Sequence, residues 1–136
     1  MKYYKVLRRF NKKLVSANVH FYQRYFTNKI NLPRIPESKL FVFTNIDSAE
    51  HFRSISMSQF PCFIYEVEVT NPFPVDSLIL TAGSVSSGWR TDRADVINSW
   101  KNFVKTKRWD TRSCYVTFAP RNTVLCDSIK IIKLIK

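Results

Sequence analysis

Basic and aromatic side chains alternate closely over the first 29 residues of the chain. Cations neutralise phosphates and release counterions, and exposed aromatic rings stack on unpaired bases, so a sheet that displays both is a candidate nucleic-acid surface. The alternative is that most of these rings fill the core. The cations of this first cluster are Arg8, Arg9, Lys12, Lys13, Arg24 and Lys29, and the rings are Tyr3, Tyr4, Phe21, Tyr22, Tyr25 and Phe26.

A second group of cations surrounds Trp109, near the end of a predicted helix. We expect it to extend the nucleic-acid surface. The alternative is that its Lys and Arg side chains only satisfy the carbonyls at the end of that helix. The cations of this second cluster are Lys101, Lys105, Lys107, Arg108 and Arg112.

Two carboxylates, Glu66 and Glu68, stand two positions apart and so share one face of a predicted strand. Such a pair can carry out acid–base chemistry when one carboxyl keeps the other protonated. The alternative is a solvated strand face that repels unwanted pairing with another strand.

Metal and cofactor chemistry find little support in the sequence. The two histidines, His20 and His51, and the three cysteines lack metal-ligand spacing, and two glycines are too few for a phosphate-binding loop. We therefore expect no metal and no cofactor. The cysteines are odd in number and widely spaced, which indicates reduced thiols in a cytoplasmic protein. No apolar stretch is long enough to span a membrane, and residues after Met1 are too polar for a signal peptide.

The net charge of +12 is distributed unevenly along the 136 residues. Residues 1–39 hold ten Lys or Arg residues and one acidic residue. Residues 40–89 hold one Lys or Arg residue and five acidic residues, and residues 90–136 hold eleven Lys or Arg residues and four acidic residues. Solubility alone requires less charge than this. If the two basic thirds lie close in space, they form a positive surface that attracts polyanions or acidic protein faces.

The elements that must position these side chains follow from periodicity and turn residues. The pattern predicts a strand over 3–10, a turn over 11–13, one long or two short strands over 14–26 and a surface loop over 27–39. Next come a strand over 40–43, a short helix near 47–54 and a strand over 62–69. A mobile loop over 81–88, a longer helix over 92–105, a strand over 114–118 and one or two strands over 123–135 complete the chain.

These elements predict a single α+β domain over residues 1–136. Its mainly antiparallel sheet, continuous or split, packs against one longer and one short helix. A chain of this length forms one core without a spare module.

Part of this order resembles the split sheet of ADP-ribosyltransferase-like folds. The resemblance is carried by the segments 4–9, 41–45, 47–52 and 64–69, which are spread over about the first half of the chain. It implies that Arg8, Thr44 and either Glu66 or Glu68 surround a nicotinamide dinucleotide, NAD. Arg8 would hold a phosphate, and the glutamate would stabilise the cationic sugar of the transition state.

The small size and the high Lys, Asn and Phe content resemble phage or other viral accessory proteins, many of which disable a host complex. We expect a basic accessory protein that engages nucleic acid or a nucleoprotein complex, as a viral inhibitor of a host system would, and the sequence leaves open whether it is also an enzyme. One alternative is an ADP-ribosyltransferase-like enzyme, or its inactive relative, that acts on NAD. Another is a protein-only inhibitor that binds an acidic host protein.

Overall fold

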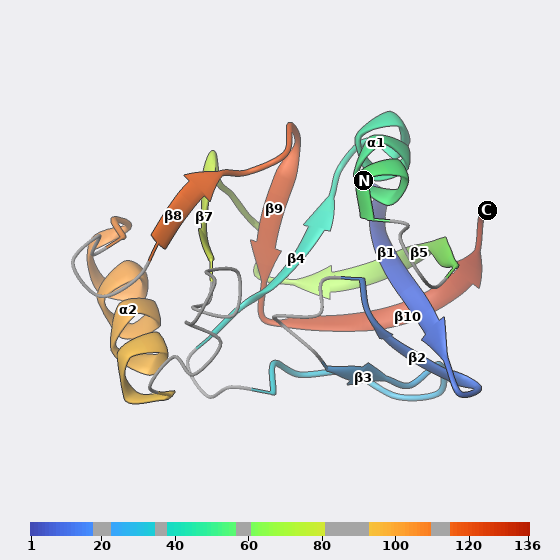
Figure 1. The fold of residues 1–136 in the computed structure, drawn as a ribbon, viewed down its shortest axis with the longest axis horizontal. Coiled ribbons are helices and arrows are strands. Elements are labelled where there is room, and N and C mark those ends of the chain that lie inside the picture. The colour runs from blue at the N-terminus through green and yellow to red at the C-terminus, as the bar shows by residue number, and fades with distance from the viewer. Residues whose placement is uncertain (18–22, 35–37, 57–60, 81–92, 110–114) are drawn as a thin grey trace.

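The computed structural model describes residues 1–17, 23–34, 38–56, 61–80, 93–109 and 115–136. These residues contain two helices, an eight-stranded antiparallel sheet and a two-stranded sheet (Figure 1). The expected α+β class with a mainly antiparallel sheet is confirmed.

The large sheet is built on β1 (Tyr3–Phe10), which pairs along most of one edge with β5 (Cys62–Thr70). Beyond β5 lies β10 (Ser128–Leu134). On the other side of β1 lie β4 (Leu40–Phe43), β9 (Thr123–Cys126) and β6 (Phe73–Pro74), in that order. β2 (Lys13–Ser16) and β3 (Arg24–Tyr25) branch from β1, and β7 (Ser77–Leu80) pairs with β8 (Tyr115–Phe118) as the second sheet.

One edge of β1 is shared between two neighbours, so the large sheet forks. Tyr4 pairs with Phe43 of β4, whereas the residues from Leu7 to Phe10 pair with β2. Lys5 lies at this fork, and its ammonium donates a 2.8 Å hydrogen bond to the Phe41 carbonyl of β4. The side chain thereby satisfies a backbone acceptor where β1 has turned away from β4.

Both helices cover the same face of the forked sheet. α1 (Ile46–Ser56) packs on β1 and β5, and α2 (Arg93–Thr106) packs on β9 further along the sheet. Side chains alternate between the two faces of a strand, so every second residue points toward the helices. On this side, Ala49 of α1 packs with Val6, Phe43 and Ile64 of the sheet, and Trp100 and Phe103 of α2 pack with Leu125 of β9.

The opposite face of the sheet is covered by the chain's own strands. β2 and β3 curl across it and contribute Leu14 and Tyr25 to the core on this side. A bridge between Asn31 and Ile129 joins the loop after β3 to β10, and this contact holds the curl in place. The remaining buried side chains of this core include Leu7, Val42, Tyr65, Val67 and Ile131.

Local sequence explains where the helices begin and end. The Asn45 side chain caps α1 by accepting hydrogen bonds from the backbone N–H groups of Asp47 and Ser48. Because Asn45 supplies the cap, α1 begins before the residue that the sequence pattern suggested. α2 ends at Thr106, since Lys107 adopts a positive φ of 62° and its N–H donates to the Phe103 carbonyl.

Most of the predicted elements are present in the described residues. The strands over 3–10, 40–43 and 62–69 and the helix over 92–105 are confirmed, and the segment 14–26 contributes two short strands. The strands β6 and β7 were not predicted, since Pro72 and Pro74 indicate the end of regular strand structure. The proposed mobile loop over 81–88 lies outside the described residues, as does His20.

No helix in the described parts of the chain is long and apolar enough to cross a membrane. Cys62 and Cys126 are buried and form no disulfide bond, and Cys114 falls outside the described residues.

Candidate nucleic-acid interface

The β1–β2 hairpin projects the first cationic cluster from the sheet. Phe10 pairs with Lys13, and the two residues between them, Asn11 and Lys12, have φ values of 49° and 64°. Two successive positive φ values match a type I′ turn, whose twist suits a tight hairpin. Arg9, Lys12 and Lys13 are exposed at this turn. The hairpin thus concentrates three cations within five consecutive residues.

β3 and the turn after it add further positive charge beside the hairpin. Arg24 pairs with Val15 of β2, which also lies opposite Arg8 of β1, so the two arginines share one face of the ribbon. Arg24 is exposed, as is Lys29 in the turn that follows. We use the term hairpin surface for the exposed cations Arg9, Lys12, Lys13, Arg24 and Lys29.

Three of the five cations of the hairpin surface, Arg9, Arg24 and Lys29, lie over aromatic rings. The guanidinium of Arg9 lies 4.8 Å from the ring centroid of Phe63. Arg24 and Lys29 lie 4.5 Å and 4.0 Å from the ring centroid of Phe26. Such contacts attract a cation to the negative face of the ring without neutralising its charge.

No carboxylate in the described structure pairs with a cation of the hairpin surface. The ion pairs among the described residues are Lys2–Glu66, Lys39–Asp127 and Lys136–Glu50. The positive charge of the hairpin surface is therefore available to a ligand.

Arg8, which the sequence analysis grouped with these cations, is half-buried. It lies beside Cys62 and near Arg53 of α1, close enough for both guanidinium groups to act on the thiol. Burial raises the pKa of Cys62, and the two arginines oppose that rise. Arg8 thus contributes to packing between the sheet and α1 and presents less charge to solvent than its neighbours do.

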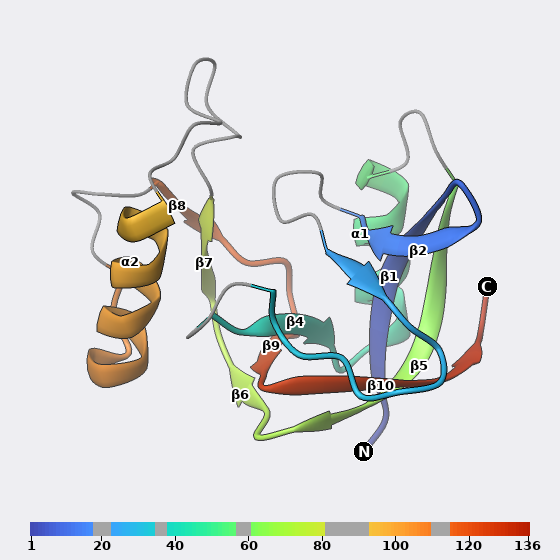
Figure 2. The same ribbon diagram turned by 90° about the horizontal axis from the view of Figure 1, so that it is seen from below.

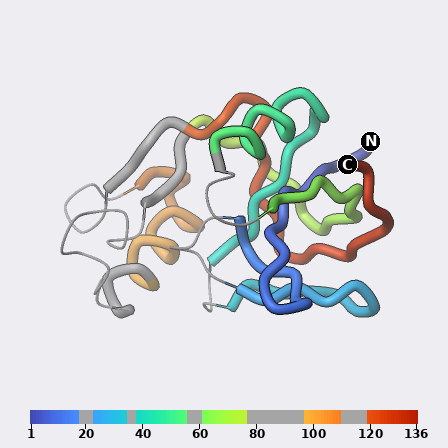
Figure 3. The backbone as a smooth tube through the Cα atoms, turned by 45° about the vertical axis from the view of Figure 1, so that its right-hand side comes forward, coloured from blue at the N-terminus to red at the C-terminus, as the bar shows by residue number. Residues whose placement is uncertain are grey.

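The second cationic cluster lies at the other end of the molecule. α2 and the β1–β2 hairpin stand at opposite ends of the longest axis in Figure 1 and are well separated in Figures 2 and 3. The two clusters therefore form two patches and not one continuous surface. Lys101, Lys105, Lys107 and Arg108 are exposed, whereas Arg112 lies outside the described residues.

Trp109, at the centre of the second cluster, is engaged with the core. Its ring stacks on Phe103 with centroids 4.1 Å apart and meets Trp100 edge-on at 4.9 Å. Lys107 lies 4.8 Å from the ring of Phe73. These contacts favour a structural role for the aromatic residues at this end.

The residues implied by the transferase resemblance lie at different places on the sheet. Glu66 pairs across the strands with Tyr4 and forms an ion pair of 3.5 Å with Lys2. Thr44, at the end of β4, lies toward the same end of β1, but Arg8 is four positions further along, or about 13 Å. Between these positions, Val6 and Ile64 are buried beneath α1. Glu68 is exposed opposite Lys130 of β10.

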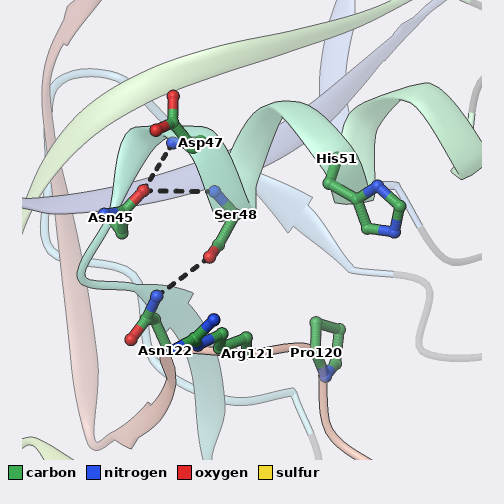
Figure 4. Close-up of a pocket in the computed structure, with 7 residues that line it drawn as sticks. All are labelled: Asn45, Asp47, Ser48, His51, Pro120, Arg121 and Asn122. Atoms are coloured by element: carbon green, nitrogen blue, oxygen red, sulfur yellow. Dashed lines mark hydrogen bonds between the residues drawn. The ribbon is translucent and has the colours of Figure 1, made fainter.

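A polar cleft of about 590 Å³ lies between the start of α1 and residues 120–122 (Figure 4). Its polar groups bond largely to one another: Asn45 caps the helix, and the Asn122 side-chain amide donates to the Ser48 hydroxyl. His51, Arg121 and Asp47 also line the cleft. The sequence does not indicate this cleft, because its residues come together only through the pairing of β4 with β9.

Lys5 is the titratable residue whose setting sequence reasoning missed. Its side chain is buried, and its ammonium lies 3.7 Å from the ring centroid of Phe41 and 5.6 Å from that of Tyr25. Burial lowers the pKa of Lys5 to about 7, an effect that Cys126 partly opposes. The position of Lys5 between Tyr4 and Val6 in a predicted strand was the only sequence signal for this setting. Its burial could not be predicted, because it depends on the fork of the sheet.

Comparison of the chain with protein-family models, with curated proteins and with solved structures gives no match. The resemblance to ADP-ribosyltransferase-like folds therefore stays a prediction. No group of three or more His, Cys, Asp or Glu side chains in the described residues could hold a metal ion.

Proposed function

We propose that this protein is an accessory protein that binds nucleic acid, alone or in a nucleoprotein complex, through the hairpin surface. The observation that carries the proposal is a set of five exposed cations on the β1–β2 hairpin, β3 and the turn after it, with Arg9 on the opposite face of the ribbon from Arg24. None of the five has a carboxylate partner among the described residues. A polyanion binds such a surface because each neutralised phosphate releases condensed counterions. Cys62 and Cys126 are buried and form no disulfide bond, which supports a cytoplasmic location.

The number of cations sets the expected salt dependence. If all five contact phosphates of a duplex, the logarithm of the association constant falls with the logarithm of salt concentration at a slope of about −4.5. Fluorescence anisotropy with a labelled duplex of about 20 base pairs, titrated at several salt concentrations, measures this slope.

Two double variants with the same change in net charge locate the contact. Lys13→Ser with Arg24→Ser removes two cations of the hairpin surface, and Lys101→Ser with Lys105→Ser removes two exposed cations of α2. We expect the hairpin variant to lose about tenfold or more in affinity and to show a slope shallower by about 2, because two phosphate contacts are gone. The α2 variant should retain the wild-type slope on a short duplex.

Two outcomes count against the proposal. Equal effects of the two variants would mean that net charge attracts the ligand without a defined interface. Absence of binding at low salt would overturn nucleic-acid binding altogether and would favour the alternative of an acidic host protein as the partner, which a pull-down at low salt then tests.

A further inference from the structure

The described rings near the hairpin surface have little free face to offer a base, and Phe21 and Tyr22 lie outside the described residues. Phe10, Phe26 and Phe63 are all half-buried. Phe26 lies within 4.5 Å of Arg24 and 4.0 Å of Lys29, and Phe63 lies 4.8 Å from Arg9, so the chain's own cations already occupy their faces. A stacking platform for single strands instead needs ring faces that a base can cover.

The same contacts hold the cations in place for phosphates. Each ring restricts the side chain above it, so less conformational entropy is lost when that side chain meets an anion. The loop that carries Phe26 and Lys29 is itself fixed by Asn31, whose side chain accepts a 2.8 Å hydrogen bond from the Phe26 N–H. The Asn31 amide donates to the carbonyls of Phe26, Lys29 and Ile129 at 3.0 to 3.2 Å.

We infer, on the basis of the proposed function, that the hairpin surface contacts the phosphate backbone without stacking on bases, and that it prefers double-stranded to single-stranded nucleic acid regardless of sequence. A duplex presents one charge per about 1.7 Å of its axis, against about 3.4 Å for one of its strands. Closely spaced cations therefore gain more binding free energy from a duplex than from a single strand. Rings that anchor cations contribute nothing that distinguishes one base from another.

Three labelled ligands of equal length test this inference: a duplex, one of its strands, and the same strand with abasic sites throughout its centre. At one salt concentration we expect the duplex to bind about tenfold more tightly than the intact strand. The abasic strand should bind within about twofold of the intact strand, because it retains every phosphate. A loss of tenfold or more on removing the bases, or a preference for the single strand, would overturn the inference.

A ring substitution gives a second, independent measure. Phe26→Leu keeps an apolar side chain at a half-buried position but removes the π face beneath Arg24 and Lys29. The ratio of affinities for the intact and abasic strands should not change. A selective loss on the intact strand would show that Phe26 stacks on a base and would contradict the inference. Failure of all three ligands to bind at low salt would instead reject the proposed function itself.

Discussion

At the scale of single residues, Lys5 brings a positive charge into the core. Its side chain is only 3% exposed, and the groups around it are the Phe41 carbonyl, the rings of Phe41 and Tyr25, and the Cys126 thiol. None of these supplies a full negative charge near neutral pH. Burial of the ammonium therefore costs free energy, which the hydrogen bond to Phe41 offsets in part.

This burial makes the stability of the protein depend on pH. The pKa of Lys5 is lowered from 10.5 to about 7 in the folded state, so between these values the unfolded chain binds more protons than the folded one. Stability therefore rises with pH across this window, by about 2 kcal/mol from pH 7 to pH 9. Above pH 9 the effect reverses, because burial raises the pKa of Cys126 from 9.0 to about 12 and also raises the pKa values of Cys62 and Tyr25.

Urea unfolding at several pH values between 7 and 10 measures this dependence. We expect Lys5→Met to abolish the rise below pH 9, since methionine keeps the apolar stem and removes the titrating group. The wild-type rise would persist in the variant if other groups caused it, and that outcome would contradict the assignment to Lys5.

At the scale of elements, the β1–β2 turn allows stability and binding to be separated. Lys12 adopts a φ of 64°, which costs a residue with a Cβ atom about 1 kcal/mol but costs glycine little. Lys12→Gly should therefore raise the free energy of unfolding by about 0.5 to 1 kcal/mol. It should also weaken duplex binding and reduce the salt slope by about 0.9, because one cation is lost.

The neighbouring turn residue supplies the matched control. Asn11→Gly changes a residue with a φ of 49° but leaves every cation in place, and asparagine already tolerates this conformation. We expect a smaller gain in stability and unchanged affinity. Thermal unfolding together with anisotropy tests both variants. A rise of both stability and affinity in Lys12→Gly would contradict a direct role of Lys12 in binding.

The loop between β3 and β4 depends on one side chain for its position. Asn31 is 4% exposed and satisfies backbone groups of Phe26, Lys29 and Ile129. Asn31→Ala leaves several of these groups unpaired, so it should destabilise the protein by about 3 kcal/mol. Asn28→Ala, at an exposed position in the same turn, serves as the control in urea unfolding. Equal stability of the two variants would show that water replaces the lost hydrogen bonds.

The elements also show how far the sequence could be interpreted. The alternation of Tyr65 and Val67 with Glu66 predicts β5 and its buried face, and the helical spacing of Trp100 and Phe103 predicts α2. The position of Asn31 could not be predicted, because its partner Ile129 lies 98 residues away in sequence. The hairpin cations could be named from composition, but their separation from the α2 cations depends on the whole strand order.

At the scale of the whole molecule, net charge opposes folding and favours binding. The chain carries a net charge of +12, and the ion pairs among its described residues involve partly or largely exposed side chains, so attraction offsets little of the repulsion. Added salt screens this repulsion. The same salt weakens the release of counterions that drives nucleic-acid binding.

Stability and affinity should therefore respond to salt in opposite directions. Between about 0.05 M and 0.3 M sodium chloride, we expect the unfolding midpoint in urea to rise while duplex affinity falls by about three to four orders of magnitude. The Lys101→Ser and Lys105→Ser double variant, with less self-repulsion, should show a weaker rise in stability and the same fall in affinity. If stability instead fell with salt, the ion pairs Lys39–Asp127 and Lys136–Glu50 would outweigh the net charge, and repulsion between the two basic ends would not govern folding.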